Sequence, residues 1–100
     1  MLLHTVNKSP FEKNSLASAL QHAKAGSGVL LIEDGVYAAL EGASTADTVK
    51  GAMGDIKVYA LGPDLKARGL EGKTIDGVEI VDYSGFVDLV CEYDKVQAWL

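Results

Sequence analysis

Gly28-Val29-Leu30-Leu31-Ile32-Glu33-Asp34 is the stretch that decides the fold, because its unbroken apolar run stops at two acids followed by Gly35. A strand with one solvated face alternates apolar and polar residues, whereas a short continuous run is typical of a strand covered on both faces. The stretch therefore predicts a buried strand in a parallel sheet.

Other segments have the composition of strands and lie on both sides of this run. Residues 56–61 and 78–82 are rich in β-branched residues and end at turn residues, and residues 2–6 would form the first strand. Residues 95–100 are a candidate for an added strand. Residues 36–40 fit either a further strand or the opening of a helix.

Helical patterns lie between these strand candidates. Apolar residues recurring at three- and four-residue spacing mark one face of a helix. Three such stripes are Leu16, Ala19, Leu20 and Ala23; Ala46, Val49, Ala52 and Met53; and Tyr83, Phe86, Val87 and Val90. Residues 63–69 predict a shorter helix, with a proline near its first position. The candidate caps are Asn14 or Ser15, Ser44 or Thr45, and Ser84, and the candidate stops are Gly26 and Gly69.

Strands that alternate with helices at this spacing predict a parallel sheet with helices on both faces. The expected fold is a three-layer α/β/α sandwich with a mainly parallel sheet of about five strands. A length of 100 residues suits one core, so residues 1–100 are expected to form one domain.

Charge and composition narrow the classes of function. The formal net charge is −5, from 9 basic and 14 acidic residues, and no Lys/Arg cluster offers a surface for phosphates. Direct binding of nucleic acid by this chain is therefore not expected. The sequence has no signal-peptide pattern, no apolar run long enough to cross a bilayer and one cysteine, Cys91. We expect a soluble cytoplasmic protein.

Two polar motifs could carry chemistry, and each has a simpler structural explanation. Gly72-Lys73-Thr74 resembles the end of a phosphate loop, but the required earlier glycine is replaced by Ala67, so a turn is predicted. Glu33, Asp34 and Asp82 follow predicted strands, where paired acids could hold Mg²⁺ or exchange protons. Acids also end strands and cap turns, and this explanation is preferred. No metal or cofactor is expected.

Cys91 is the one nucleophile that the residue types single out. It lies on the last predicted helix, at the flank of the apolar stripe, with Asp88, Glu92 and Asp94 nearby in the sequence. Carboxylates disfavour a thiolate, so catalytic use is not favoured. His4 and His22 have no recognisable Ser or Cys partner in the sequence, and a hydrolytic triad has no support.

The chain ends on Ala98-Trp99-Leu100, which is unusual because free termini are commonly polar and frayed. A terminal tryptophan must pack either against its own domain or against a partner. Trp99 and Leu100 are therefore interface candidates, with packing in their own core as the alternative.

Several segments, in order along the whole chain, resemble the TusB/DsrH family. The segments are residues 4–11 (HTVNKSPF), 33–39 (EDGVYAA), 57–61 (KVYAL), 64–69 (DLKARG), 81–89 (VDYSGFVDL) and 96–100 (VQAWL). The resemblance implies a DsrE/F/H-like fold. It also implies a heterohexamer with DsrE/TusD-like and DsrF/TusC-like subunits, two copies of each.

In this family the complex takes persulfide sulfur from a small carrier protein and passes it on. The resemblance implies an end use either in 2-thiolation of the tRNA wobble uridine or in dissimilatory sulfur oxidation, with the principal sulfur-carrying cysteine on another subunit. Some members have their own cysteine on the first helix, at the position that corresponds to Ala19 here. We therefore expect a non-catalytic subunit. The alternative hypothesis is a sulfur carrier that uses Cys91 as its persulfide site.

Overall fold

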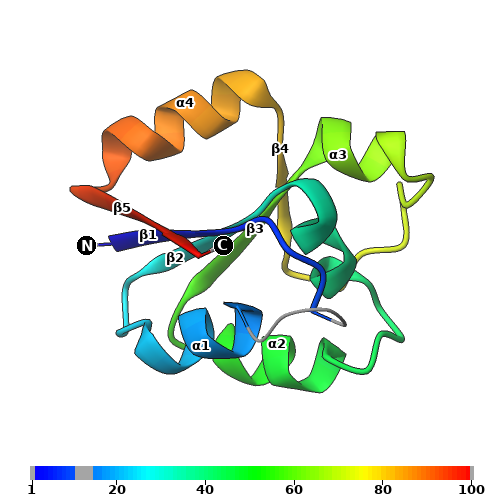
Figure 1. The fold of residues 1–100 in the computed structure, drawn as a ribbon, viewed down its shortest axis with the longest axis horizontal. Helices are drawn as coiled ribbons and strands as arrows, with labels where there is room; N and C mark the ends of the chain where they lie inside the picture. The colour runs from blue at the N-terminus through cyan, green and yellow to red at the C-terminus, as the bar shows by residue number, and fades with distance from the viewer. Residues whose placement is uncertain (1, 11–14, 100) are drawn as a thin grey trace.

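The computed structural model describes residues 2–10 and 15–99 and contains a five-stranded sheet with helices on both faces (Figure 1). The strands are β1 (Leu2–Val6), β2 (Gly28–Leu31), β3 (Lys57–Leu61), β4 (Glu79–Val81) and β5 (Lys95–Trp99). Their order is β4-β3-β2-β1-β5, and all the pairings between them are parallel. The predicted α/β fold with a mainly parallel sheet is confirmed, and the C-terminal segment is the added strand.

The helices connect the strands in the predicted alternation. They are α1 (Ser15–His22), α2 (Ala46–Ala52), α3 (Gly62–Ala67) and α4 (Tyr83–Glu92), together with the 3₁₀ helix η1 (Glu33–Ala39). Residues 36–40, left open between strand and helix, thus belong mainly to η1. Gly35 lies in the first turn of η1, and its backbone is so close to the Val6 carbonyl group that a Cβ atom would have no room.

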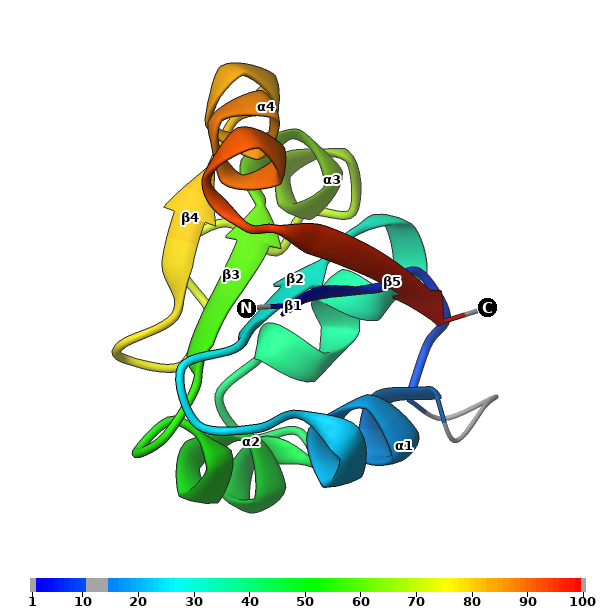
Figure 2. The same ribbon diagram turned by 90° about the vertical axis from the view of Figure 1, so that its left-hand side faces the viewer.

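The strand order explains why the two faces of the sheet are covered unequally. From β1 to β4 each strand is added on the same side of the previous one, and the chain then returns to place β5 on the other side of β1. Crossovers between parallel strands are right-handed, so this single reversal of direction puts α4 on the face opposite the earlier helices. Figure 2 shows α1 and α2 on one side of the sheet and α4 on the other.

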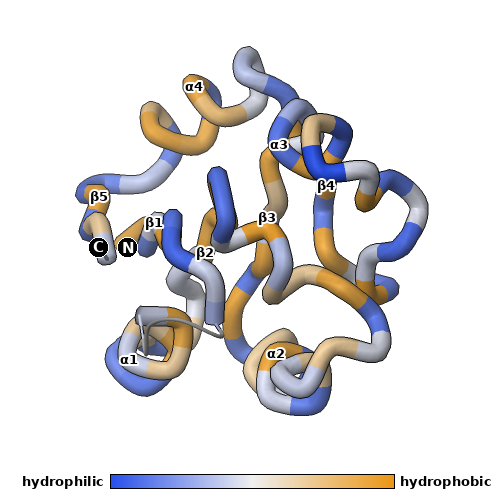
Figure 3. Tube along the Cα trace, turned by 45° about the vertical axis from the view of Figure 1, so that its right-hand side comes forward, coloured by the Kyte–Doolittle hydropathy of each residue, from blue (hydrophilic) through white to orange (hydrophobic). Residues whose placement is uncertain are grey.

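The main core lies on the face that α1 and α2 cover. Its buried residues come from the three central strands and from η1, α1, α2 and α3, and Leu65 of α3 is among them. All residues of β2 are buried, as the continuous apolar run predicts. The core under α4 is smaller and consists of Leu3, Leu30, Tyr59 and Leu89. Figure 3 shows hydrophobic segments both in the central strands and along α4.

The ends of the helices differ in part from the predictions. Ser84 is not the cap of α4, because Asp82 occupies that position and its Oδ1 accepts a hydrogen bond from the Gly85 amide at 2.7 Å. Thr45 precedes α2 but makes no side-chain cap hydrogen bond, since its backbone is already helical. Gly69 has a φ of 68° and is the predicted left-handed stop after α3.

The first helix, α1, ends several residues before the predicted stop at Gly26. It ends at His22, and Gly26, at a φ of 88°, lies in the following turn rather than directly at the helix end. The amide of Gly26 donates to the Asp55 carbonyl, so this glycine ties the turn to the segment before β3. Ser15 is the first residue of α1, and the alternative cap Asn14 lies outside the described residues.

Candidate functional site

Ala19 lies on α1 and is fully buried in the main core. The apolar stripe of this helix faces the sheet, so a side chain at this position contacts other core residues rather than solvent. A methyl group fills the position, and no sulfur nucleophile is present there.

Cys91 lies on α4, on the opposite face of the sheet, and its side chain is exposed. Exposure is one of the two conditions for a reactive thiol; the other is a lowered pKa, which positive neighbours produce. In the sequence its neighbours on the helix, Asp88 and Glu92, are acidic. Ala19 and Cys91 therefore do not form a common site.

The three acids that follow strands take part in structural contacts, Asp34 and Asp82 through their carboxylates and Glu33 through its backbone amide. Asp34 Oδ1 accepts hydrogen bonds from Arg68 Nε at 3.0 Å and Nη2 at 2.9 Å, an ion pair that joins η1 to the end of α3. The Glu33 amide donates to Asp64 Oδ2 at 2.6 Å, and Asp82 caps α4. Within residues 2–10 and 15–99, no group of three His, Cys, Asp or Glu side chains is placed to hold a metal ion.

Gly72-Lys73-Thr74 is a turn, as predicted. Gly72 has a φ of 76°, the Lys73 carbonyl accepts from the Glu41 amide at 3.0 Å, and Thr74 pairs with Leu40 in an isolated antiparallel bridge. The segment follows α3 and leads into β4 instead of joining a strand to a helix, so it lacks the geometry of a phosphate loop.

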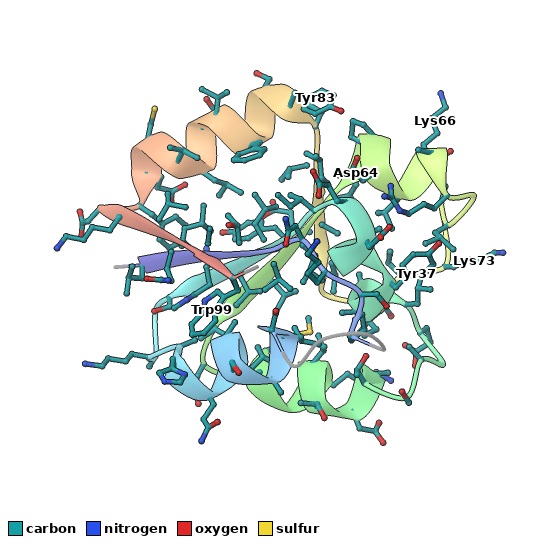
Figure 4. All side chains as sticks on the ribbon, in the orientation of Figure 1. Tyr37, Asp64, Lys66, Lys73, Tyr83 and Trp99 are labelled. Atoms are coloured by element: carbon teal, nitrogen blue, oxygen red, sulfur yellow. The ribbon has the colours of Figure 1, made fainter. Side chains whose placement is uncertain are left out.

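Trp99 packs against its own domain. Its ring lies against the main core and is 5.4 Å from the His22 ring and 6.2 Å from the His4 ring, measured between centroids. The indole Nε1–H donates a hydrogen bond to His4 Nδ1 at 3.0 Å. Figure 4 shows Trp99 between the sheet and α1. The other interface candidate, Leu100, lies outside the described residues.

Sequence reasoning missed this cluster of His4, His22 and Trp99, because its members come from β1, α1 and β5. His4 is buried, and its Nε2 atom has no hydrogen-bond partner among the described residues. Burial, followed by the charge of His22, lowers the pKa of His4 below its usual value of 6.5. The neutral ring is therefore the favoured form in the folded protein.

The apolar stripe of α4 does not face the core as a whole. Leu89 is buried and Phe86 is half-buried against the sheet, whereas Tyr83 and Val87 are each 62% exposed and Val90 is 40% exposed. The periodicity predicted the helix, but it did not predict which of its sides would be covered. Figure 4 shows Tyr83 at the start of α4, on the side of the sheet away from α1 and α2.

A parallel five-stranded sheet with this division of helices defines the class of small α/β proteins to which several solved structures belong. The chain is similar to the YchN protein from Escherichia coli, with a TM-score of 0.78, 21% identity and 97% of each chain covered. It is also similar to protein Tm0979 from Thermotoga maritima, with a TM-score of 0.65 and 31% identity, covering 94% of this chain and 95% of that one.

The sequence comparisons identify the family within this class. The family model described as "DsrH like protein" matches residues 8–96. Protein TusB of Escherichia coli K12 and protein TusB of Shigella flexneri are each 38% identical over 98 residues, which cover 98% of this chain and all of theirs. The chain belongs to the DsrH family and is a homologue of TusB.

No helix in residues 15–99 is long and apolar enough to span a membrane.

Proposed function

We propose that this chain is a non-catalytic subunit of a cytoplasmic sulfurtransferase complex that relays persulfide sulfur. Its partners are a DsrE/TusD-like and a DsrF/TusC-like subunit in a heterohexamer, together with small sulfur-carrier proteins. The sulfur ends in the wobble uridine of tRNA or in the reactions of dissimilatory sulfur oxidation. The DsrH family membership supports the assignment to such a complex.

The observation that carries the non-catalytic assignment is the burial of Ala19 in the main core. The position that corresponds to the first-helix cysteine of some family members has neither a thiol nor access to solvent. The subunit therefore contributes assembly and docking surfaces, while a cysteine of another subunit carries the sulfur. A net charge of −5 also suits a protein that does not itself bind tRNA.

One observation favours the alternative that this chain carries sulfur on Cys91. A persulfide carrier must expose its thiol to a donor and an acceptor, and the thiol of Cys91 is exposed. The balanced step would transfer a sulfane sulfur from the donor's persulfide to the Cys91 thiolate, releasing the donor as a thiolate. This hypothesis makes Cys91 indispensable, whereas the preferred one does not.

The deciding experiment loads the reconstituted three-subunit complex from a donor with ³⁵S-labelled persulfide and separates the subunits without reductant. We expect no label on this chain, and a Cys91→Ala variant should relay sulfur at the wild-type rate. A complex in which the partner subunit's cysteine is replaced serves as the negative control. Reducible label on this chain that Cys91→Ala removes, with loss of relay, would contradict the proposal.

A further inference from the structure

The side of the sheet that carries α4 is only partly covered. Five strands spaced by about 4.8 Å make a sheet about 19 Å wide. The ten residues of α4 span about 15 Å along the helix axis, and the helix is narrower than that across its axis. One helix is therefore too narrow to cover the whole sheet. Figure 2 shows α4 away from the far end of β5, and the core beneath the helix comes from Leu3, Leu30 and Tyr59 of β1, β2 and β3. The β5 edge of this face therefore has no covering helix in the described structure, and its Val96 and Ala98 are exposed.

Large apolar side chains remain exposed on this side. Tyr83, Val87 and Val90 follow one another at helical spacing, so they form a single ridge along α4, and each is at least 40% exposed. Val96 of β5 is 44% exposed and pairs in register with Leu3, which belongs to the core under α4. Val96 therefore points to the same side of the sheet. We call these four residues the α4 face.

Most of the charged residues in the segment that carries the α4 face are acidic. Between Glu79 and Asp94 the chain contains five acidic residues and no basic one. Lys95 follows, but its register partner is Leu2 and it alternates with Val96, so it points to the opposite side of the sheet. Lys57 lies near Glu92 at the end of α4, where both line a shallow hollow. Apart from Lys57 at that end, the charged residues named here on the α4 side are acidic.

This charge pattern decides between the possible occupants. Two copies of the chain joined through their α4 faces would bring carboxylates against carboxylates, which opposes association. A protein with an apolar centre and a rim of Lys and Arg would instead bury the ridge and pair its cations with Asp88 and its acidic neighbours.

We propose that the α4 face is the docking surface for a related subunit whose own contact surface is apolar with a basic rim. The inference rests on the proposed function, since it assigns to this face the assembly role inferred above. It also accounts for the exposure of the ridge, because contiguous exposed apolar groups on a small protein commonly mark an interface.

The test uses Val87→Lys, which places a cation in the ridge, and a matched control, Ala17→Lys, at an exposed position of α1 on the opposite face. Each full-length variant is titrated calorimetrically with the co-purified DsrE/TusD-like and DsrF/TusC-like subunits from the same organism. We expect Val87→Lys to weaken binding at least about tenfold, as for a central contact, and Ala17→Lys to leave it unchanged. Circular dichroism and urea unfolding confirm that both variants fold.

The outcomes separate this inference from the proposed function. If the wild-type chain binds neither subunit, the proposed function fails and the inference fails with it. If the wild type binds and Val87→Lys binds equally well, the function stands but the α4 face is not the interface. If the wild type instead forms a homodimer that Val87→Lys dissociates, the face binds a second copy and the charge argument is wrong.

Discussion

His4 combines burial with a single hydrogen bond, and both depend on its neutral form. Its Nδ1 atom accepts from Trp99 Nε1–H, so the neutral ring carries its proton on Nε2. Protonation would put an N–H group opposite another N–H group and place a charge inside the core. The lowered pKa of His4 follows from burial first and from its neighbour His22 second.

We therefore predict that acid destabilises the protein through His4. Below the ordinary histidine pKa of 6.5 the unfolded chain binds a proton that the folded chain does not yet accept. The stability is complete above pH 6.5 and declines as the pH falls toward the lowered pKa. Urea unfolding at several pH values from 7.5 to 5 measures the decline. A His4→Gln variant should show a shallower one, and an unchanged slope in that variant would remove His4 as the cause.

Gly35 offers a second test at a single position. A Cβ atom there would lie 2.9 Å from the carbonyl carbon of Val6 and closer still to its oxygen, and this backbone is fixed within the sheet. We expect Gly35→Ala to lower the free energy of unfolding by about 2 kcal/mol or more.

Gly51→Ala is the control, because a Cβ atom at that helical position meets nothing within 4 Å. The control should be neutral or stabilising by about 0.5 kcal/mol. Equal effects of the two substitutions in urea unfolding would refute the steric argument.

At the scale of elements, α4 begins at a cap that differs from the predicted one. Asp82 accepts from the Gly85 amide, whereas Ser84 already lies within the helix. We expect Asp82→Ala to cost about 1 kcal/mol of stability, the usual value for a lost cap, and Ser84→Ala to cost much less. Chemical unfolding of the two variants measures this difference directly. The reverse ranking would restore Ser84 as the cap.

Prediction from sequence succeeded where an element carries its own signal. The continuous run in β2 predicted a strand buried on both faces, and Gly69 predicted the end of α3, where the structure has the left-handed conformation. It failed where the outcome depends on distant residues. Periodicity could not show that Leu89 faces the sheet while Val87 faces solvent, because the covered side of α4 depends on the order of all five strands.

The same limit applies to the candidate site. Burial of Ala19 followed from its place in a local stripe. The cluster of His4, His22 and Trp99 did not, because the hydrogen bond between Trp99 and His4 joins residues 95 positions apart. It forms only because β5 returns to pair with β1, and no local pattern encodes that pairing.

At the scale of the whole molecule, the return of the chain has two consequences. It places β5 beside β1 and so closes the main core with Trp99. It also sends α4 to the face opposite α1 and α2, where the residues of the α4 face stay exposed in the described structure. The same topological reversal thus completes one side of the fold and leaves the other available for assembly.

The closing role of Trp99 gives a prediction about the isolated chain. Trp99→Ala should lower the free energy of unfolding by about 3 kcal/mol, because it removes a large aromatic group from the core and leaves the acceptor of His4 unpaired. Trp99→Phe keeps much of the packing and loses the hydrogen bond. We therefore expect it to lower the free energy of unfolding by about 1 kcal/mol for the hydrogen bond, with a further loss because the phenyl ring is smaller than the indole.

Urea unfolding of the monomeric variants distinguishes a core role of Trp99 from a partner-binding one. The graded loss of stability, with assembly impaired only as far as folding is, would establish that the terminal tryptophan belongs to its own domain. If Trp99→Ala were as stable as the wild type yet unable to join the other subunits, Trp99 would instead be an anchor for a partner. The interface would then include the tail of β5 as well as the α4 face.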